Sequence, residues 1–399
     1  VTTGADIDVA VAPFPCANAT CLQAPEFPCR RPKEPSAVAW VGIRSPARIP
    51  HERPGLFDDF STVVLFLVFG IAGALVVGAS IKATGLADTI ADRTGMGEAM
   101  VGGLVLGGAT SLSGVVVSVT AASSGDASFA ISNAVGGIAA QTLFLAIADL
   151  IYRRANLEHA AAEPANMFQA VLLLILLSLP IAAMAGPDFS FFAIHPVSII
   201  LFAGYLWGVR LATSVRNRPM WEPVETGETR FDEPEDKADA AKSARKPAII
   251  FAALVVVMAG CGWVISQVGG QFISRFGLSS SLVGSLVTAV VTSLPELVTT
   301  LVAVRRGALQ LAVGGIIGGN TFDTLFLVFS DVAYREGSIF HAVGMNDLYW
   351  FATGLIMTAV LLAGLILRQR EGPARIGIES ALMIAVYALA VGVEVFARA

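Results

Sequence analysis

The sequence predicts an all-α polytopic membrane protein with about ten transmembrane helices, arranged as two inverted repeats of five helices each. Three observations predict this fold class. Hydrophobic residues make up 55% of the 399 residues and charged residues only 14%, and the mean hydropathy is +0.71, as is typical of helical membrane proteins. Long apolar segments recur without the ten-residue alternation of a transmembrane β-barrel. One part of the chain also repeats another.

Residues 1–56 are interpreted as a separate N-terminal extension. Nine of the 19 prolines fall here and no apolar run is long enough to pack, so we expect this extension to be disordered. Cys16, Cys21 and Cys29 leave two alternatives open, one disulfide with a spare thiol or a metal site, but a disordered extension is favoured over both. No secretory signal peptide is expected, since a basic start followed by an apolar stretch is missing.

Ten apolar segments follow, and each reaches or approaches the ~20 residues that a spanning helix needs. We expect them at 60–81, 97–122, 128–151, 167–186, 192–213, 248–270, 280–304, 309–332, 347–367 and 375–396. A polar linker at 216–246 separates a first half, 57–215, from a second half, 247–399. This linker is too short for a folded calcium-sensor domain and contains no EF-hand spacing.

The positive charges predict an orientation in the membrane. Of the 20 lysines and arginines beyond the extension, 17 lie in connections that follow odd-numbered helices. By the positive-inside rule the 216–246 linker is cytoplasmic and both termini lie outside. We therefore expect a multi-pass protein of the plasma membrane. The small net charge of −5 argues against a nucleic-acid partner.

An internal repeat supports the division into halves. A shift of 182 residues aligns 95–153 with 277–335 without a gap, and about 21 of the 59 pairs are identical. Because the shift spans five predicted helices, an odd number, the two copies must cross the membrane in opposite directions, as in many secondary transporters. The matched pairs include Thr110 with Thr292, Gly136-Gly137 with Gly318-Gly319, and Asp149 with Asp331. Both aspartates precede an arginine by four residues, which predicts helix-end ion pairs.

Two carboxylates lie in otherwise apolar sequence, Glu296 in Val291-Thr-Ser-Leu-Pro-Glu296 and Asp323 in Gly314-Gly-Ile-Ile-Gly-Gly-Asn-Thr-Phe-Asp323. A charged side chain at the centre of a bilayer costs roughly 2.5–3.5 kcal/mol, so such residues indicate function. Pro295 removes a backbone donor and is expected to bend or break its helix, exposing carbonyl oxygens. Carboxylate, hydroxyl and carbonyl oxygens together are the ligands of small hard cations. The alternative for Glu296 is a protonated carboxyl with a structural role.

These two motifs resemble the α-repeat of the calcium/cation antiporters, which include the sodium/calcium exchangers. The resemblance covers roughly 120 residues in the two repeats. It implies a fold of ten helices with inverted repeats and the exchange of Ca²⁺ for Na⁺, K⁺ or H⁺. It also implies that Glu296 is the main ligand of the second repeat, with Thr292 and Ser293 beside it and with Asp323 and Asn320 on the next helix.

The first repeat departs from this pattern. Where the second repeat has Glu296, the first has Gly114, so half of the carboxylate ligation that the resemblance implies is missing. We expect neutral oxygens in its place, from Thr110, Ser111, Ser113 and Gln141. Threonines in membrane helices often bond their own backbone instead, which is the alternative for Thr110 and Thr292.

The sequence thus predicts a secondary active cation antiporter, with Glu296 and Asp323 as metal ligands in a site at the midplane. It would exchange Ca²⁺ for Na⁺ or H⁺ by alternating access. The expected partners are the lipid bilayer and inorganic cations, with no cofactor besides the transported ions. One alternative is a monovalent cation/proton antiporter, and another is a non-transporting membrane scaffold derived from an exchanger. No nucleophile–base set or nucleotide-binding loop indicates an enzyme.

Overall fold

The computed structural model describes residues 56–94, 107–152, 155–224, 244–370, 372 and 376–397. All of the helices belong to one compact unit, Pro54–Ala399. The predictions for the extension, including those for its three cysteines, fall outside the described residues. Apart from one isolated bridge between Phe191 and Ile194, the regular structure in this part of the chain is helical.

Within the described residues, nine helices or helical spans are long and apolar enough to cross a membrane, and a tenth apolar helix is shorter. The first half contains α1 (Thr62–Thr94), α3 (Gly107–Thr110), α4 (Leu112–Ser123), α5 (Ala127–Tyr152), α6 (Leu157–Ala160), α7 (Pro164–Ala185) and α8 (Pro196–Asn217). The second half contains α9 (Arg245–Phe276), the span α10 (Ser280–Leu282), η2 (Val283–Thr288) and α11 (Ala289–Arg306), then α12 (Leu309–Ala333), η3 (Ile339–His341), α13 (Met345–Leu367), α14 (Ile378–Gly392) and η5 (Val393–Ala397).

Nine of the ten predicted segments each overlap one of these helices or spans, and the described part of the second, 97–122, overlaps two, because Ser111 separates α3 from α4. The largest difference is in α1, which continues to Thr94 rather than ending at 81, because no proline follows Lys82 within the helix and the single Gly85 does not end it. The described part of the second segment begins at Gly107. Helices also reach the edges of the predicted linker, since α8 ends at Asn217 and α9 begins at Arg245.

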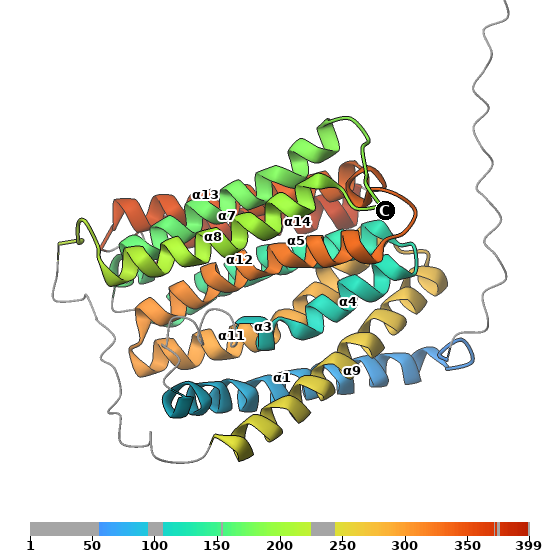
Figure 1. The fold of residues 1–399 in the computed structure, drawn as a ribbon, viewed down its shortest axis with the longest axis horizontal. Coiled ribbons are helices and arrows are strands. Elements are labelled where there is room, and N and C mark those ends of the chain that lie inside the picture. Colours follow the sequence, from blue (N-terminus) through green and yellow to red (C-terminus); the bar gives the residue numbers. More distant parts are fainter. Residues whose placement is uncertain are drawn as a thin grey trace, which may run out of the picture. The chain divides into compact units, whose positions relative to one another are not determined.

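Two helices form the centre of the unit. In the most apolar window of α5 and of α12, 78% and 72% of the residues are buried, against only 17% in α9. In Figure 1 these two helices run side by side, with α7, α8, α13 and α14 on one side and α1, α4, α9 and α11 on the other. The central helices are the ones whose sequences carry the paired glycines, which allow close helix approach.

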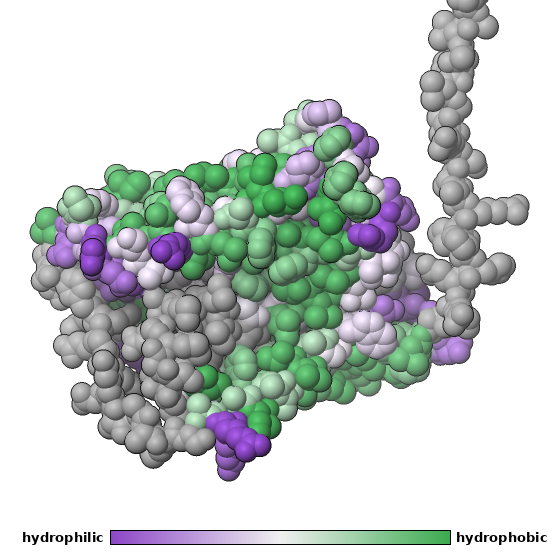
Figure 2. All heavy atoms as spheres, viewed as in Figure 1, coloured by the Kyte–Doolittle hydropathy of each residue, from purple (hydrophilic) through white to green (hydrophobic). Residues whose placement is uncertain are grey.

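The outer helices present apolar side chains to their surroundings. Figure 2 shows apolar residues along the length of the helices and hydrophilic residues gathered toward the helix ends. Examples on α1 and α8 are Val63, Ile199 and Trp207, which are 64–69% exposed. A contiguous exposed apolar surface of this kind is what contact with lipid tails requires.

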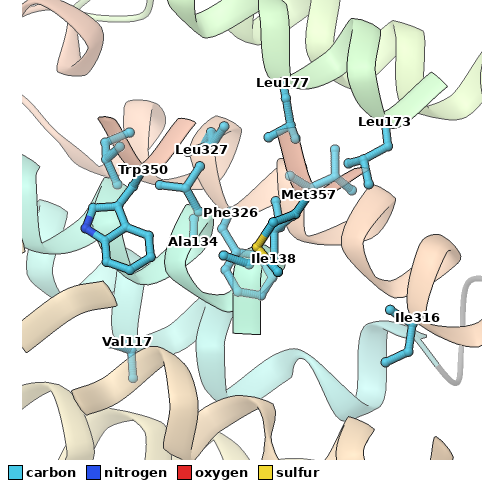
Figure 3. Packing of buried hydrophobic residues seen from close by; sticks show 14 of the residues in the cluster. Val117, Ala134, Ile138, Leu173, Leu177, Ile316, Phe326, Leu327, Trp350 and Met357 are labelled. Carbon is cyan, nitrogen blue, oxygen red and sulfur yellow. The ribbon is translucent and has the colours of Figure 1, made fainter. Parts of the chain in front are cut away.

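The buried core joins the central pair to α7 and α13. Figure 3 shows part of this cluster, including Ile138 of α5, Phe326 of α12, and Trp350 and Met357 of α13. All four side chains are at most 4% exposed. This core fixes α5 against α12, and these two helices carry part of the candidate site.

Asp331, at the end of α12, does not form the predicted ion pair. Its carboxylate accepts hydrogen bonds from the backbone N–H of His195 (2.7 Å) and Ile339 (3.2 Å) and from Oγ of Ser198 (2.6 Å). Arg335 instead donates to a main-chain oxygen of the preceding turn. The prediction was wrong because the unpaired N–H groups of two helix starts are brought to the buried carboxylate, and they satisfy it without a cation.

The equivalent Asp149, at the end of α5, makes the same two main-chain contacts with the two halves exchanged. It accepts from the backbone N–H of Leu157 (2.7 Å) and Gly377 (3.1 Å). Both donors lie 182 positions from the corresponding residues around Asp331, and each aspartate caps one helix of its own half and one of the other. Such reciprocal contacts are the mark of a two-fold axis. The inverted repeat seen in the sequence is therefore present in the packing.

Candidate functional site

Glu296 is held in a span that combines two kinds of helix. The π-helical segment η2 precedes α11, and α11 continues through Pro295, so the predicted helix break does not occur. A proline inside a helix still lacks the N–H that would bond the carbonyl of residue 291. π-Helical segments are rare and often found at functional sites. The irregularity therefore ends at Thr288, about two turns before Glu296, rather than at Glu296 itself.

A small cavity lies between α4, α5, α11 and α12. It leaves about 10 Å³ for the centre of a water-sized sphere, which is space for about one water molecule or one small ion. Its lining combines two carboxylates, hydroxyls and amides with glycines and one aromatic ring. The lining residues are Ser111, Gly114, Asn133, Gly137, Gln141, Thr292, Ser293, Glu296, Asp323 and Phe326.

Glu296 is 6% exposed and has neutral hydroxyl neighbours from the first repeat. Oγ of Ser111 donates to its Oε1 at 3.4 Å, and the Thr110 side chain also hydrogen bonds to this carboxylate. Thr292, one turn earlier on the same span, donates to main-chain oxygens of its own helix, at 2.9 and 3.2 Å. Its hydroxyl keeps acceptor capacity toward the cavity. The Oε2 atom of Glu296 has no hydrogen-bond donor.

Asp323 is joined to the first repeat by Gln141. Nε2 of Gln141 donates to Oδ2 of Asp323 at 2.6 Å and to Oγ of Ser293 at 3.4 Å. Oδ1 of Asp323 and Oε1 of Gln141 have no donor, although both residues are at most 2% exposed. With Glu296, the cavity residues thus present three buried oxygens without a donor.

Unpaired acceptors of this kind are what a cation-binding site would present. Buried polar groups are normally paired, because an unpaired one costs about 1–3 kcal/mol. Here the unpaired atoms of the cavity carboxylates and of Gln141 are all acceptors, which a positively charged ligand would satisfy. The described residues contain no group of three or more histidine, cysteine, aspartate or glutamate side chains placed to hold a metal. Any cation here would therefore depend on two carboxylates and on neutral oxygens.

At Gly114, where the first repeat lacks the carboxylate that Glu296 supplies in the second, the space is occupied by the phenyl ring of Phe326. A Cβ atom at Gly114 would lie 2.6 Å from Cε2 and 3.0 Å from Cζ of Phe326. Asn133, whose counterpart in the second repeat is Gly315, hydrogen bonds to neighbouring helices. Its Nδ2 donates to the main-chain oxygen of Gly114 (3.2 Å) and to Oγ of Ser118 (2.9 Å), and its Oδ1 accepts from Thr288 (2.7 Å). The first repeat therefore contributes neutral groups only.

The structure brings most of the predicted residues to one place. Glu296, Asp323, Thr292, Ser293, Ser111 and Gln141 line the cavity, and Thr110 contacts Glu296. Asn320 does not line it; its Nδ2 donates to Oγ1 of Thr142 at 2.9 Å. The sequence reasoning missed Phe326 because this residue is identical to its counterpart in the first repeat, Phe144. The signal that could have found it was the combination of a lost side chain at Gly114 with a large neighbour.

Comparison with known proteins gives a consistent result. The family model described as "Sodium/calcium exchanger protein" matches residues 64–212 and 246–396. The chain is 36% identical over 102 residues to the putative antiporter CaxA of Alkalimonas amylolytica and 33% identical over 95 residues to the sodium/calcium exchanger MaX1 of Methanosarcina acetivorans. These matches span 26% and 24% of this chain, and only 30% and 25% of the respective relatives.

Solved structures extend the likeness to most of the chain. The H⁺/Ca²⁺ exchanger CAX superposes with a TM-score of 0.61 at 12% identity, over 84% of this chain and 86% of its own. The sodium–calcium exchanger NCX_Mj superposes with a TM-score of 0.55 at 18% identity, over 83% of this chain and 99% of its own. At these identities the likeness concerns the fold.

Proposed function

Because this chain belongs to the sodium/calcium exchanger protein family, we propose that it is a secondary active antiporter that exchanges Ca²⁺ for Na⁺ or H⁺. It is a multi-pass integral membrane protein and a transporter rather than an enzyme. The observation that carries the proposal is the set of buried acceptor oxygens without donors on Glu296, Asp323 and Gln141. These residues, with Ser111 and Ser293, bind the transported cation.

The charge of the site supports this proposal. Glu296 and Asp323 carry a charge of −2 when both are ionised, which balances one Ca²⁺ or two monovalent ions. When the cation leaves, Na⁺ or protons neutralise these carboxylates, so binding of the two substrates is mutually exclusive. Hydroxyl and amide oxygens supply the remaining ligands. Cation and counter-ion therefore compete for the same oxygens, as antiport requires.

Alternating access follows from the two-fold arrangement. The site lies where α4 and α5 of the first repeat meet α11 and α12 of the second. Rocking one group of helices against the other opens this meeting point to one side of the membrane at a time. We place the protein in the plasma membrane, with the 216–246 linker cytoplasmic, because 17 of the 20 basic residues beyond the extension lie on that side.

A second candidate function is the exchange of a monovalent cation for protons. It is favoured by one observation, that Gly114 and Phe326 stand where the first repeat would supply a further carboxylate. Ca²⁺ binds six to eight oxygens and usually more than one carboxylate. A site with two carboxylates, in which the ring of Phe326 occupies one side, offers Ca²⁺ fewer oxygen ligands.

The test is ⁴⁵Ca²⁺ uptake by proteoliposomes that contain the purified protein. An outward Na⁺ gradient and an outward H⁺ gradient are applied in parallel, with Glu296→Gln as the site variant and Asp188→Asn, an exposed carboxylate, as the matched control. We expect uptake under one gradient, its loss in Glu296→Gln and normal uptake in Asp188→Asn. Normal uptake in Glu296→Gln would overturn the assignment of the site. Na⁺/H⁺ exchange without Ca²⁺ uptake would establish the second candidate function.

A further inference from the structure

Two glutamates outside the cavity lie side by side at one end of the helical unit. Glu158 is in α6 and Glu379 is in the first turn of α14, and both pack against Gly364 of α13. A Cβ atom at Gly364 would lie 2.5 Å from Cγ of Glu379 and 3.2 Å from Cγ of Glu158. Glu379 is only 5% exposed and Glu158 only 2% exposed. The glycine thus makes the room in which both side chains are buried.

The hydrogen bonding of this pair is incomplete. Oε1 of Glu158 receives one long bond, from Oγ of Ser380 at 3.5 Å. The Oε2 atoms of Glu158 and Glu379 have no donor. Asp149, by contrast, receives two main-chain N–H groups in the same region. Two buried carboxylates that lack donors cannot both be ionised without a large free-energy cost, whereas one proton between them removes the repulsion and supplies a donor.

Within the described residues, neither glutamate forms an ion pair with a basic side chain. The described charged or titratable groups around the pair are Asp149 at the end of α5, His159 of α6 and Arg368 after α13. The Arg368 guanidinium donates to two main-chain oxygens, one of them that of His159 at 3.4 Å. Nδ1 of His159 lies 2.6 Å from the main-chain oxygen of Arg368. Burial, and then the charges of Asp149 and Glu379, raise the pKa of Glu158 to about 8.

The repeat shows that the fold does not require these acids. A shift of 182 residues places Phe340 opposite Glu158, and Val197 opposite Glu379. Phe340 is fully packed, at 1% exposure. The capping aspartates Asp149 and Asp331 are present in both halves, so the surrounding architecture is the same. Apolar residues thus serve the equivalent position at the other end, and the glutamates are a feature of one end only.

We propose that Glu158 and Glu379 form a proton-binding site that is separate from the cation cavity and responds to pH at this end of the protein. Asp149, whose side chain adjoins the pair, follows Gln141 of the cavity by eight residues on α5, a rise of about 12 Å. With the proton bound, α6, α13 and α14 pack around a pair that carries a single negative charge. Loss of the proton places a second negative charge between α6, α13 and α14 and destabilises their packing. The proposal does not depend on which cation is transported.

The sign of the pH dependence follows from proton linkage. The unfolded chain releases this proton near the ordinary glutamate pKa of 4.5, and the folded protein releases it near 8. Between these values the folded state holds the additional proton, so this group lowers the stability of the fold as pH rises through that window. Below pH 4.5 and above pH 8 its contribution is constant.

The test is thermal unfolding of the full chain in detergent at pH 5, 7 and 9. Glu158→Gln and Glu379→Gln each replace one acid by its neutral isostere, and Glu163→Gln, which removes a partly exposed carboxylate paired with Arg216, is the matched control. We expect the first two variants to match the unaltered protein at pH 5 and to unfold at least roughly 2 °C higher at pH 9. The control should run parallel to the unaltered protein. Parallel behaviour of all three variants would overturn the proposal.

If Glu158→Gln or Glu379→Gln does not fold, a second measurement tests whether the glutamate pair holds a proton. The infrared spectrum of a Glu296→Gln/Asp323→Asn protein, in which both cavity carboxylates are neutral, should contain the band of a protonated carboxyl that disappears between pH 7 and 9. A spectrum without such a band would show that the pair holds no proton. At pH 7 the band should be present in the folded Glu296→Gln/Asp323→Asn protein and absent when Glu158→Gln is added.

Discussion

The contact between Gly114 and Phe326 makes a prediction about packing at the candidate site. In Gly114→Ala the new Cβ atom would lie 2.6 Å from a ring that is itself only 4% exposed. Overpacking of this kind costs about 1–3 kcal/mol, against a gain of about 1 kcal/mol for replacing a glycine inside a helix. We therefore expect a net loss of up to roughly 2 kcal/mol in the free energy of unfolding. Gly260→Ala, where nothing lies within 4 Å, keeps only the gain and is the control.

The same contact decides how a carboxylate can be restored to the first repeat. Gly114→Glu alone should destabilise the protein, whereas Gly114→Glu with Phe326→Leu gives the new side chain room. One charge-assisted contact contributes about 1.5–3 kcal/mol, so the double variant should bind Ca²⁺ roughly tenfold or more tightly than Phe326→Leu. Isothermal titration calorimetry in detergent measures this difference. Equal affinities would refute the reasoning, because they would show that residue 114 does not face the bound cation.

Three further predictions concern other contacts. Gln141→Leu removes the donor to Asp323 at 2.6 Å and should lower stability by about 1–3 kcal/mol together with cation affinity; unchanged calorimetric binding would argue against its place in the site. Asp331→Asn keeps the shape but loses acceptor capacity toward the three donors of this cap, so its unfolding temperature should fall by several degrees, while Asp188→Asn, the exposed control, should be neutral. Arg230→Cys should react with a membrane-impermeant thiol reagent only from the cytoplasmic side, and external labelling would reverse the topology.

The fold could be predicted from the sequence because it depends on local and periodic signals. Segment length and hydropathy located the helices, and the 182-residue shift predicted the inverted repeat that Asp149 and Asp331 then display in their contacts. The role of these two aspartates was not predictable. For Asp331 the arginine four residues later suggested an ion pair, whereas its partners are helix starts whose approach depends on tertiary packing. Arg153, the predicted partner of Asp149, lies outside the described residues. His195 and Gly377 are distant in sequence from the carboxylates that they contact.

The candidate site was predicted in its chemistry but not in its shape. Buried carboxylates stand out in apolar sequence, so Glu296 and Asp323 were found, and the repeat then brought in Ser111 and Gln141 as neutral partners. The direction of the Asn320 side chain depends on the angular position of this residue around α12, which places it beside Thr142. The ring that covers Gly114 likewise depends on the distance between α4 and α12. Composition and spacing carry no information on such distances.

The hydrogen bond between Gln141 and Asp323 has a consequence for how this protein could have been built. The two residues are 182 positions apart and touch at 2.6 Å, so they sit on the axis that relates the halves. In a dimer of two identical five-helix chains, this place would hold either two aspartates or two glutamines, and an aspartate pair would need a shared proton to provide a donor. A chain that joins two halves can instead place an aspartate and a glutamine there. Fusion thus permits a charge on one side of the axis and its neutral donor on the other.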